Sequence, residues 1–297
     1  MRVAHLPDFT GLEQELHDAD IFMGYSLEPD LLSLAPKLQW IHSVSAGVKQ
    51  FMYPELRERG VLLTNATSVH AIPIAQHILG TLVALARRFP DSVRHQQQAL
   101  WAQNELWTAP VKPREISGQT ILFIGFGEIG RETAKLLRPL NMHIWAVTQS
   151  GTSASDLAER VFTASKLHEA LPHADFVVVA APDTPQTRNI LGAAEFGLMK
   201  PTAYLINVAR GTLIDEPALI DALRSNRIAG AALDVTVKEP LPPESPLWKL
   251  PNAFITPHVS GATEDTWQRQ EDLIAENLQL WFEGKKLRNV VDLSRGY

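Results

Sequence analysis

The chain has 297 residues, which is long enough for two domains of ordinary size and a substantial buried core. Hydrophobic residues make up 45% of it and charged residues 20%, a composition typical of a soluble globular protein. The net charge of −6 and the pI near 5.9 speak against a nucleic-acid partner, because phosphate binding needs a concentrated basic face.

Residue types narrow the chemistry further. The chain has no cysteine, which excludes disulfides, thiolate zinc sites and cysteine nucleophiles. Histidine pairs such as His70/His77 and His168/His173 lack both a one-face helical spacing and neighbouring carboxylates, so we expect no metal site. There is no run of about 18 apolar residues to span a membrane and no apolar signal-peptide core at the start. We therefore expect a cytoplasmic protein without a membrane partner.

The first ninety residues alternate short apolar runs with amphipathic stretches. Strands are predicted over 2–6, 20–25, 39–44 and 61–65, which indicates a small, flavodoxin-like α/β domain with a parallel sheet. A strongly apolar helix is predicted over 74–88, with Phe89-Pro90 as its stop.

Segment 91–114 is polar and rich in glutamine, but it contains Trp101 and Trp107. It is typical of a connector that leaves the compact domain. Two tryptophans outside a core are more easily explained by burial against another chain than by exposure.

From residue 119 strands and helices alternate more regularly, in continuous apolar runs. This pattern predicts a parallel sheet covered on both faces, the doubly wound (Rossmann) architecture. Strands are expected in TILFIG, HIWAV, FVVVAA, AYLINV, IAGAALDV and AFITP, with helices over 128–137, 166–171, 193–199 and 216–225. A last amphipathic helix over 264–282 can return to the first domain. We predict a substrate domain formed by 1–91 with 272–297, and a dinucleotide-binding domain over 92–271.

The segment GFGEIG follows an apolar strand and opens a helix, as a dinucleotide fingerprint requires. Gly125 would make the tight turn, Gly127 would let the backbone approach a pyrophosphate, and Gly130 would let helix and strand pack closely. Arg131 lies beside the helix N-terminus, where N–H groups attract phosphate. Glycine-rich turns also join strands to helices for purely steric reasons, so this motif gains its weight from its context.

The strand HIWAV is followed by Thr148, Gln149 and Ser150, where this fold normally presents an acid to a ribose hydroxyl. Without the acid, the 2′-phosphate of NADP is not repelled, and hydroxyl groups can donate to it. No arginine occurs between Asn141 and Glu159 to bind that phosphate. We therefore favour NADP over NAD and keep dual specificity as the alternative.

Several separated segments in one order resemble the D-2-hydroxyacid dehydrogenase family. They are GFGEIGR, APDTPQTRNIL, INVARGTLIDEPALIDAL, AALDVTVKEPLPPESPLWKLPNAFITPH, SAGV and TNATSVHAIPIAQH. The resemblance covers most of the chain and implies hydride transfer between nicotinamide and C2 of a small 2-oxo or 2-hydroxy acid, of the glyoxylate or hydroxypyruvate type. It also implies a homodimer formed through segment 91–114. Corepressors on the same fold, which use the nucleotide as a sensor, are the alternative.

The family resemblance assigns the reacting groups to Arg210, Glu239 and His258. The chemistry asks for these residue types: a guanidinium fork holds a 2-oxo carboxylate, and histidine donates a proton near neutral pH. Glu239 would orient the imidazole and favour its charged form. Each also has a simpler interpretation, as a surface or helix-capping arginine, a solvated turn glutamate and a structural loop histidine.

The resemblance places the substrate carboxylate on the backbone of Ser45, Ala46, Gly47 and Val48. Asp234 matches an aspartate near the nicotinamide carboxamide in the family. Gln76 stands where many relatives carry glutamate, which leaves the identity of the acid open. The remaining residues that the resemblance places at the cofactor are Glu128, Ile129, Ala181, Pro182, Thr187, Val208, Ala209 and Gly261.

Overall fold

The computed structural model describes residues 2–6, 10–153 and 155–294. Contacts divide the chain into two compact units, with unit 1 formed by Met1–His70 and Thr263–Tyr297 and unit 2 by Ala71–Ala262. The sequence pattern placed these boundaries about twenty and ten residues later, at 91/92 and 271/272. The difference at the first boundary arises because α4 (Thr67–Ala86) begins in unit 1, while Ile74, Ile78 and Leu82 pack in a core of unit 2.

Unit 1 contains a parallel three-stranded sheet in the order β1-β2-β3, with Trp40 of β2 opposite Ile21 of β1 and Leu62 of β3. Its core gathers large apolar side chains such as Leu16, Ile41 and Phe51. Its elements are α1 (Leu12–Leu16), β1 (Ile21–Gly24), α2 (Pro29–Ser33), β2 (Trp40–Ser43), the 3-10 helix η1 (Lys49–Phe51), α3 (Pro54–Arg59), β3 (Leu62–Thr64), the start of α4, and α11 (Thr266–Phe282).

The strand predicted over 2–6 is not formed. These residues are irregular, and Val3 is 74% exposed. An alternating apolar pattern satisfies local preference, but a strand also needs a neighbour to accept its hydrogen bonds. The first strand of the described chain is therefore β1.

Unit 2 is built on a parallel seven-stranded sheet in the order β10-β9-β8-β7-β4-β5-β6. The chain order reverses direction at β4, which is the doubly wound arrangement and confirms the predicted fold class. The strands are β4 (Thr120–Ile124), β5 (His143–Thr148), β6 (Arg160–Thr163), β7 (Phe176–Val179), β8 (Tyr204–Asn207), β9 (Gly230–Leu233) and β10 (Ala253–Ile255).

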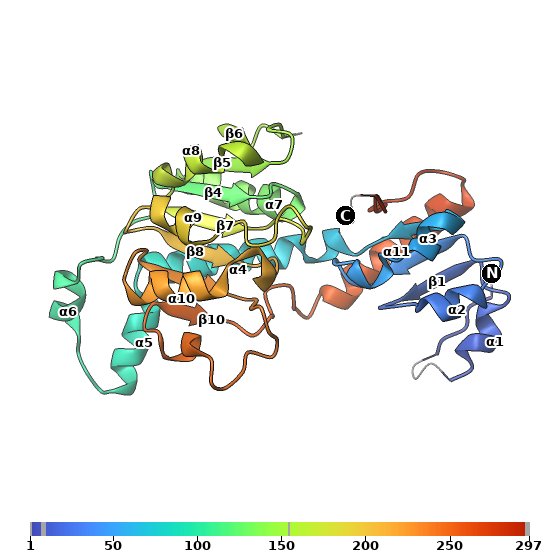
Figure 1. Cartoon of the computed structure of the whole chain (residues 1–297), viewed down its shortest axis with the longest axis horizontal. Helices are drawn as coiled ribbons and strands as arrows, with labels where there is room; N and C mark the ends of the chain where they lie inside the picture. The colour runs from blue at the N-terminus through green and yellow to red at the C-terminus, as the bar shows by residue number, and fades with distance from the viewer. Residues whose placement is uncertain (1, 7–9, 154, 295–297) are drawn as a thin grey trace. The chain divides into compact units, whose positions relative to one another are not determined.

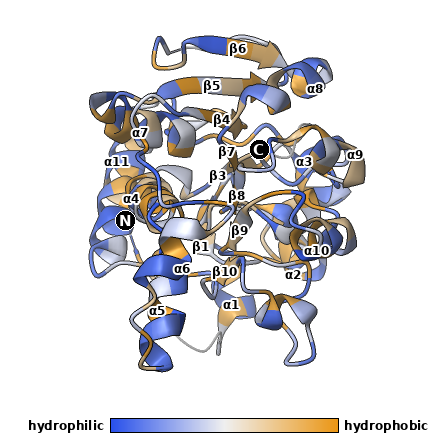
Figure 2. Cartoon of the chain, turned by 90° about the vertical axis from the view of Figure 1, so that its left-hand side faces the viewer, coloured by the Kyte–Doolittle hydropathy of each residue, from blue (hydrophilic) through white to orange (hydrophobic). Residues whose placement is uncertain are grey.

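Helices cover both faces of this sheet, as Figures 1 and 2 show. α4 and α7 pack on one face, and α8, α9 and α10 pack on the other. Each face of the sheet has its own apolar core. The α-helices of unit 2 besides α4 are α5 (Phe89–Gln97), α6 (Gln103–Thr108), α7 (Glu128–Leu137), α8 (Leu167–Ala170), α9 (Ala193–Leu198) and α10 (Glu216–Arg224). Its 3-10 helices are η2 (Arg138–Leu140), η3 (Ala164–Lys166), η4 (Leu171–His173), η5 (Gly211–Leu213) and η6 (Pro246–Lys249).

Unit 2 differs from the sequence expectations at two further places. Strand β6 was not expected, because RVFT is a short run that begins with arginine and is only half-buried. Phe89-Pro90 was expected to stop a helix, but it begins α5, since proline fits the first turn of a helix, where its missing N–H has no intrahelical partner anyway. Segment 91–114 therefore includes most of α5 and all of α6.

Helix α4 is long and apolar enough to cross a membrane by length and composition, contrary to the expectation from the sequence. More than half of its apolar window is buried inside the structure. Ile78, Leu82 and Ala86 are fully or almost fully buried and pack with strands of unit 2. We therefore interpret α4 as a core helix.

Candidate active site

The candidate residues of unit 2 follow the carboxyl ends of its parallel strands. Gly125 follows β4, Thr148 ends β5, Ala181 lies just after β7, Arg210 after β8, Asp234 after β9 and His258 after β10. Carboxyl ends of parallel strands meet at one edge of the sheet, where doubly wound proteins bind ligands. The structure thus brings the unit 2 residues named from the sequence to one edge.

Gly125 makes the tight turn after β4. Its φ of +88° lies in the left-handed region, and a Cβ there would be 2.7 Å from the carbonyl oxygen of Ala180 and from the backbone of Ala181. A side chain would therefore collide with backbone that cannot yield. Gly130 has a similar constraint from the ring of Phe126, 2.9 Å away.

Gly127, in contrast, has open space where a Cβ would stand. It is the N-cap of α7, which begins at Glu128 without a side-chain cap. The N–H groups of Glu128 and Ile129 in the first turn are therefore available to an anion, and the helix dipole favours negative charge there. Arg131 is half-buried in the next turn and donates from Nη1 to the carbonyl of Phe126 at 3.3 Å. This turn fits a pyrophosphate.

The end of β5 is a hydroxyl-rich turn. Thr148 Oγ1 donates to the carbonyl of Thr152 at 3.0 Å, while the hydroxyls of Ser150 and Thr152 lie 2.8 Å apart. Gln149 is exposed. The proton of Thr148 is therefore used within the turn, whereas the Ser150–Thr152 pair keeps a hydroxyl proton for a ligand. This differs from the expectation that Thr148 would itself donate to phosphate.

The segments after β7 and β8 are fixed by internal hydrogen bonds. Thr187 Oγ1 donates to the carbonyl of Pro182 at 2.6 Å. The side chain of Asn207, which is fully buried, accepts from the N–H of Ala209 and donates to the carbonyl of Arg210. Val208 is buried between them. Asn207 thus sets the backbone that carries Arg210, a role that the sequence analysis did not assign.

Arg210 is exposed, and its Nη1 donates to the carbonyl of Ala209 at 2.6 Å. The guanidinium is not paired with a carboxylate in the described part of the chain. A guanidinium in this state keeps donors for a carboxylate ligand.

His258 and Glu239 meet directly. His258 Nδ1 lies 2.6 Å from Glu239 Oε2, and the two side chains remain 50% and 36% exposed. A carboxylate can only accept, so the imidazole Nδ1 carries the proton and Nε2 is left for a ligand. The pair has the geometry of an acid–base group oriented by a carboxylate.

Asp234 holds the loop that carries His258. Its carbonyl accepts from the N–H of His258 at 2.8 Å, and its carboxylate accepts from the N–H groups of Val259 and Ser260, both at 3.0 Å. Burial opposes ionisation, but the hydrogen bonds from Ser260, Thr256 and Val259 outweigh it and keep the pKa of Asp234 below its usual range. His258 has a φ of +53°, and these contacts compensate that strain. Gly261 follows in the same loop.

Two further residues support this loop and were missed in the sequence. Thr256 Oγ1 donates to Asp234 Oδ1 at 2.6 Å, and its oxygen lies 3.3 Å from Nε2 of His77, from α4. Burial lowers the pKa of His77, with the charge of Asp234 acting in the opposite direction. A threonine before Pro257 and an isolated histidine in an apolar helix carry no sequence signal for such a contact.

The candidate substrate residues of unit 1 form the loop after β2. Its carbonyls are bound by the protein: Ser45 O accepts from Ala66 N, Ala46 O from Asn65 Nδ2, and Gly47 O from Ser45 Oγ. Val48 is buried. Within the described ranges, the N–H groups of Ala46 and Gly47 meet no acceptor, so this loop can offer them to a carboxylate.

The described residues contain no group of three or more histidine, cysteine, aspartate or glutamate side chains that could hold an ion. The polar groups gathered at the carboxyl edge of unit 2 are its glycine-rich turn, its guanidinium and its imidazole–carboxylate pair.

Such a set on a doubly wound sheet is typical of nicotinamide-dependent oxidoreductases. The family described as D-isomer specific 2-hydroxyacid dehydrogenase, NAD binding domain, matches residues 79–260. The chain belongs to this family.

Individual relatives agree. The chain is 32% identical to the D-3-phosphoglycerate dehydrogenase of Methanocaldococcus jannaschii over 96% of its own length and 55% of that protein, so it spans about half of this relative. It is 33% identical to the glyoxylate reductase of Thermofilum pendens over 85% of this chain and 74% of that one. The NADPH-dependent glyoxylate/hydroxypyruvate reductase of Sinorhizobium meliloti, solved with NADP and sulfate, matches with a TM-score of 0.82 at 26% identity, covering 98% and 90% of the two chains.

Proposed function

We propose that this dehydrogenase works as a reductase of small 2-oxo acids of the glyoxylate or hydroxypyruvate type, forming the D-2-hydroxy acid, with NADPH preferred over NADH. The 2.6 Å contact between His258 Nδ1 and Glu239 Oε2 carries the proposal, because it leaves Nε2 of an oriented imidazole to act on the substrate. The glyoxylate reductases among its relatives support the substrate class.

Each residue has a separate task in the reduction. Arg210 binds the carboxylate of the 2-oxo acid and polarises its ketone. The nicotinamide, when bound, supplies the hydride to C2. His258 gives the proton on Nε2 to the ketone oxygen, and Glu239 stabilises the imidazolium before the transfer by accepting from Nδ1–H. The neutral imidazole that remains keeps the Nδ1–H tautomer, because Glu239 still accepts from it.

Turnover tests this function. We expect the protein to oxidise NADPH with at least one of a panel of 2-oxo acids that includes glyoxylate and hydroxypyruvate. The absorbance of NADPH measures this reaction. His258→Ala should lower kcat by about 10²–10⁴-fold, the range typical of a general acid. Arg210→Lys keeps the charge but loses the planar fork, so KM for the acid should rise while cofactor affinity is unchanged.

The opposite results have clear meanings. Nucleotide binding without turnover on any acid would favour a sensor on this fold. Near-normal activity of His258→Ala would remove His258 from the mechanism. Equal loss of cofactor and acid affinity in Arg210→Lys would assign Arg210 a structural role.

We further infer that the protein acts in the cytoplasm and forms a homodimer through segment 91–114. The proposal of a dimer rests on two tryptophans of this segment, since Trp101 and Trp107 are 87% and 69% exposed. Large apolar side chains at this level of exposure are typical of surfaces that bind another chain.

A further inference from the structure

Two consecutive N–H groups before Glu239 each donate to a different glutamate. Thr236 N lies 3.0 Å from Glu239 Oε1, and Val237 N lies 3.1 Å from Glu216 Oε2. Glu239 uses its other oxygen, Oε2, for His258. Glu239 and Glu216 therefore hold two successive peptide groups, Val235–Thr236 and Thr236–Val237, which share the Cα of Thr236.

The Thr236–Val237 peptide is also supported by direct backbone contact. A Cβ on Gly211 would lie 2.0 Å from the carbonyl carbon of Thr236, 2.2 Å from its oxygen and 2.3 Å from Val237 N. Gly211 therefore packs its backbone flat against the Thr236–Val237 peptide. Gly211 follows Arg210 directly, and Glu216 begins α10 five residues later. One short segment thus carries the guanidinium and holds the turn that presents Glu239.

We infer that Glu216 is a positioning residue, which holds the Thr236–Val237 peptide by the hydrogen bond from Val237 N and so fixes Glu239 against His258. This role rests on the proposed reductase function, and it gives a task to a glutamate outside the Arg210, Glu239 and His258 set. In the described part of the chain, Glu216 is bonded to Val237 N and not to the imidazole, so it acts through this peptide.

The local surroundings make the effect separable from folding. Val237 is 50% exposed, so water can replace Glu216 on its N–H when the carboxylate is removed. Asp215, not Glu216, caps α10 by accepting from Ala218 N, so the helix keeps its cap. The loss of Glu216 should loosen the turn without unfolding unit 2.

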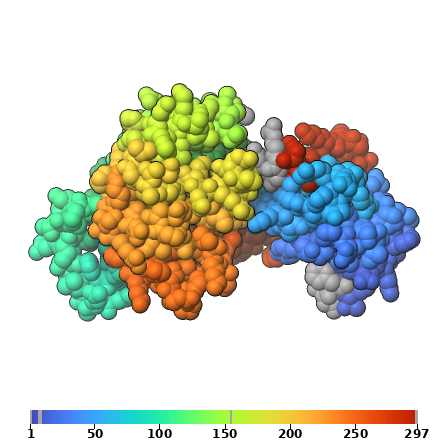
Figure 3. Space-filling view, viewed as in Figure 1, coloured from blue at the N-terminus to red at the C-terminus, as the bar shows by residue number. Residues whose placement is uncertain are grey.

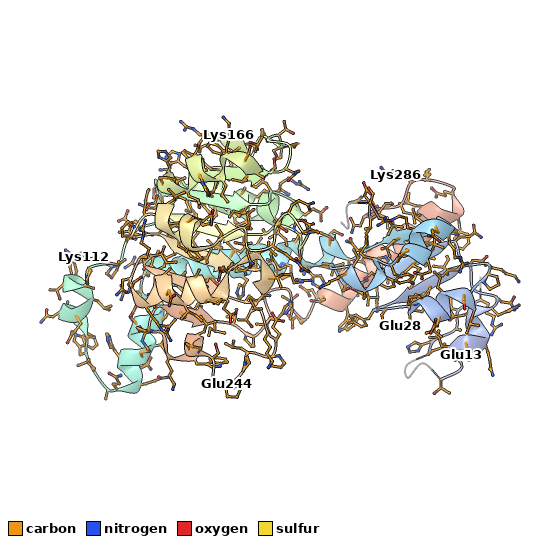
Figure 4. The ribbon with its side chains drawn as sticks, in the orientation of Figure 1. Glu13, Glu28, Lys112, Lys166, Glu244 and Lys286 are labelled. Atoms are coloured by element: carbon orange, nitrogen blue, oxygen red, sulfur yellow. The ribbon has the colours of Figure 1, made fainter. Side chains whose placement is uncertain are left out.

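The test compares Glu216→Ala with Glu216→Gln, because the glutamine carbonyl can still accept from Val237 N while the charge is gone. Glu244→Ala is the matched control: Glu244 is an exposed glutamate between Glu239 and β10, labelled in Figure 4. We expect Glu216→Ala to lower kcat about tenfold, since small displacements of a catalytic group are costly, with cofactor affinity unchanged. Glu216→Gln and Glu244→Ala should stay close to the parent protein.

A readout without turnover separates this inference from the proposed function. The Nδ1–H proton of His258, assigned by its loss in His258→Ala, should give a downfield NMR resonance in the parent protein and in Glu216→Gln, because it is held by Glu239 Oε2. In Glu216→Ala it should broaden or disappear. If the parent protein reduces no 2-oxo acid, the function fails while this comparison still tests Glu216. An unchanged resonance in Glu216→Ala, or equal losses in the alanine and glutamine variants, would overturn the positioning role.

Discussion

At the scale of single residues, the turn after β5 carries an uncharged residue, Thr148, at the position where this fold normally has an acid. The Thr148 hydroxyl is held by the carbonyl of Thr152, and the neighbouring hydroxyls of Ser150 and Thr152 bind each other. This turn contains no carboxylate to repel a 2′-phosphate. The proposed preference for NADPH therefore depends on the missing negative charge and not on a phosphate bond from Thr148.

Thr148→Asp restores the missing charge. We expect the ratio of kcat/KM for NADPH to that for NADH to fall by tenfold or more, about 1.4 kcal/mol, through repulsion of the 2′-phosphate. Thr148→Asn is the control: asparagine has the shape of aspartate without its charge, so it should change the ratio little. A parent protein that already prefers NADH by an order of magnitude would contradict the proposed preference.

His42 is a buried histidine in a closed polar network of unit 1. Its Nδ1 lies 2.8 Å from Thr64 Oγ1, which also accepts from Trp40 Nε1, and its Nε2 lies 2.9 Å from Gln270 Nε2. The amide of Gln270 can only donate from nitrogen, so Nε2 accepts and the ring is neutral. Burial lowers the pKa of His42 to about 4.

This network makes the stability of unit 1 dependent on pH. The pKa of His42 is about 6.5 in the unfolded chain and lower in the folded chain, so between these two pH values the unfolded chain is protonated and the folded chain is not. The contribution of His42 to stability is therefore complete above pH about 6.5 and is lost as the pH falls. The loss by pH 4 should be roughly 3 kcal/mol. Urea unfolding from pH 7 to pH 4 should show a shallower pH slope for His42→Gln than for the parent, whereas exposed His5→Gln should keep the parent slope. Parallel slopes in all three proteins would contradict this prediction.

At the scale of elements, two glycines differ in their surroundings: one lies in close contact with another backbone segment, and the other stands in open space. The backbone of Gly211 lies against Thr236, whereas Gly80 in α4 has no heavy atom within 4 Å of a Cβ position. Gly80 is also exposed. The same substitution should therefore have opposite effects in these two places.

Gly211→Ala should destabilise unit 2 by about 1–3 kcal/mol or more and reduce activity, because the Thr236 backbone cannot move without displacing Glu239. Gly80→Ala should instead stabilise the protein by about 0.5–1 kcal/mol, since alanine restricts the unfolded chain and favours helix. Thermal unfolding and kcat of both variants check the pair. A Gly211→Ala protein as stable and active as the parent would show that the close contact is not maintained in solution.

The sequence predicted the elements whose pattern is local and strong. The limits of α7 were predicted to the residue, and the six expected strands of unit 2 are all present. The failures depend on tertiary contacts: β6 forms because it pairs with β5, whereas 2–6 has no neighbouring strand among the described residues. The same applies to the site. GFGEIG is visible in the sequence, but the links from Glu216, Asn207 and Thr256 exist only after folding.

At the scale of the whole molecule, α5, α6 and the loop between them carry a group of exposed large apolar side chains. Figure 3 shows this segment standing out from the body of unit 2. Its most exposed large side chain is Trp101, at 87%, and Trp107, Phe89, Val93 and Leu100 are each at least 45% exposed. A surface of this kind is costly in water unless a partner covers it.

A second copy of the chain is the partner that we propose, and the mass in solution tests it. Closed two-fold pairing lets each copy cover the other's segment with the same residues, which is the commonest way for a soluble chain to bury such a surface. A stable interface needs about 800 Å² from each partner, so loss of both indoles should weaken it strongly. Sedimentation velocity at micromolar concentration should give a dimer for the parent and a monomer for Trp101→Ser/Trp107→Ser. Trp267→Ser, which removes a tryptophan of unit 1 that is 65% exposed, should remain dimeric. A parent protein that is strictly monomeric at this concentration would refute the dimer, and a double variant that stays dimeric would move the interface away from these two tryptophans.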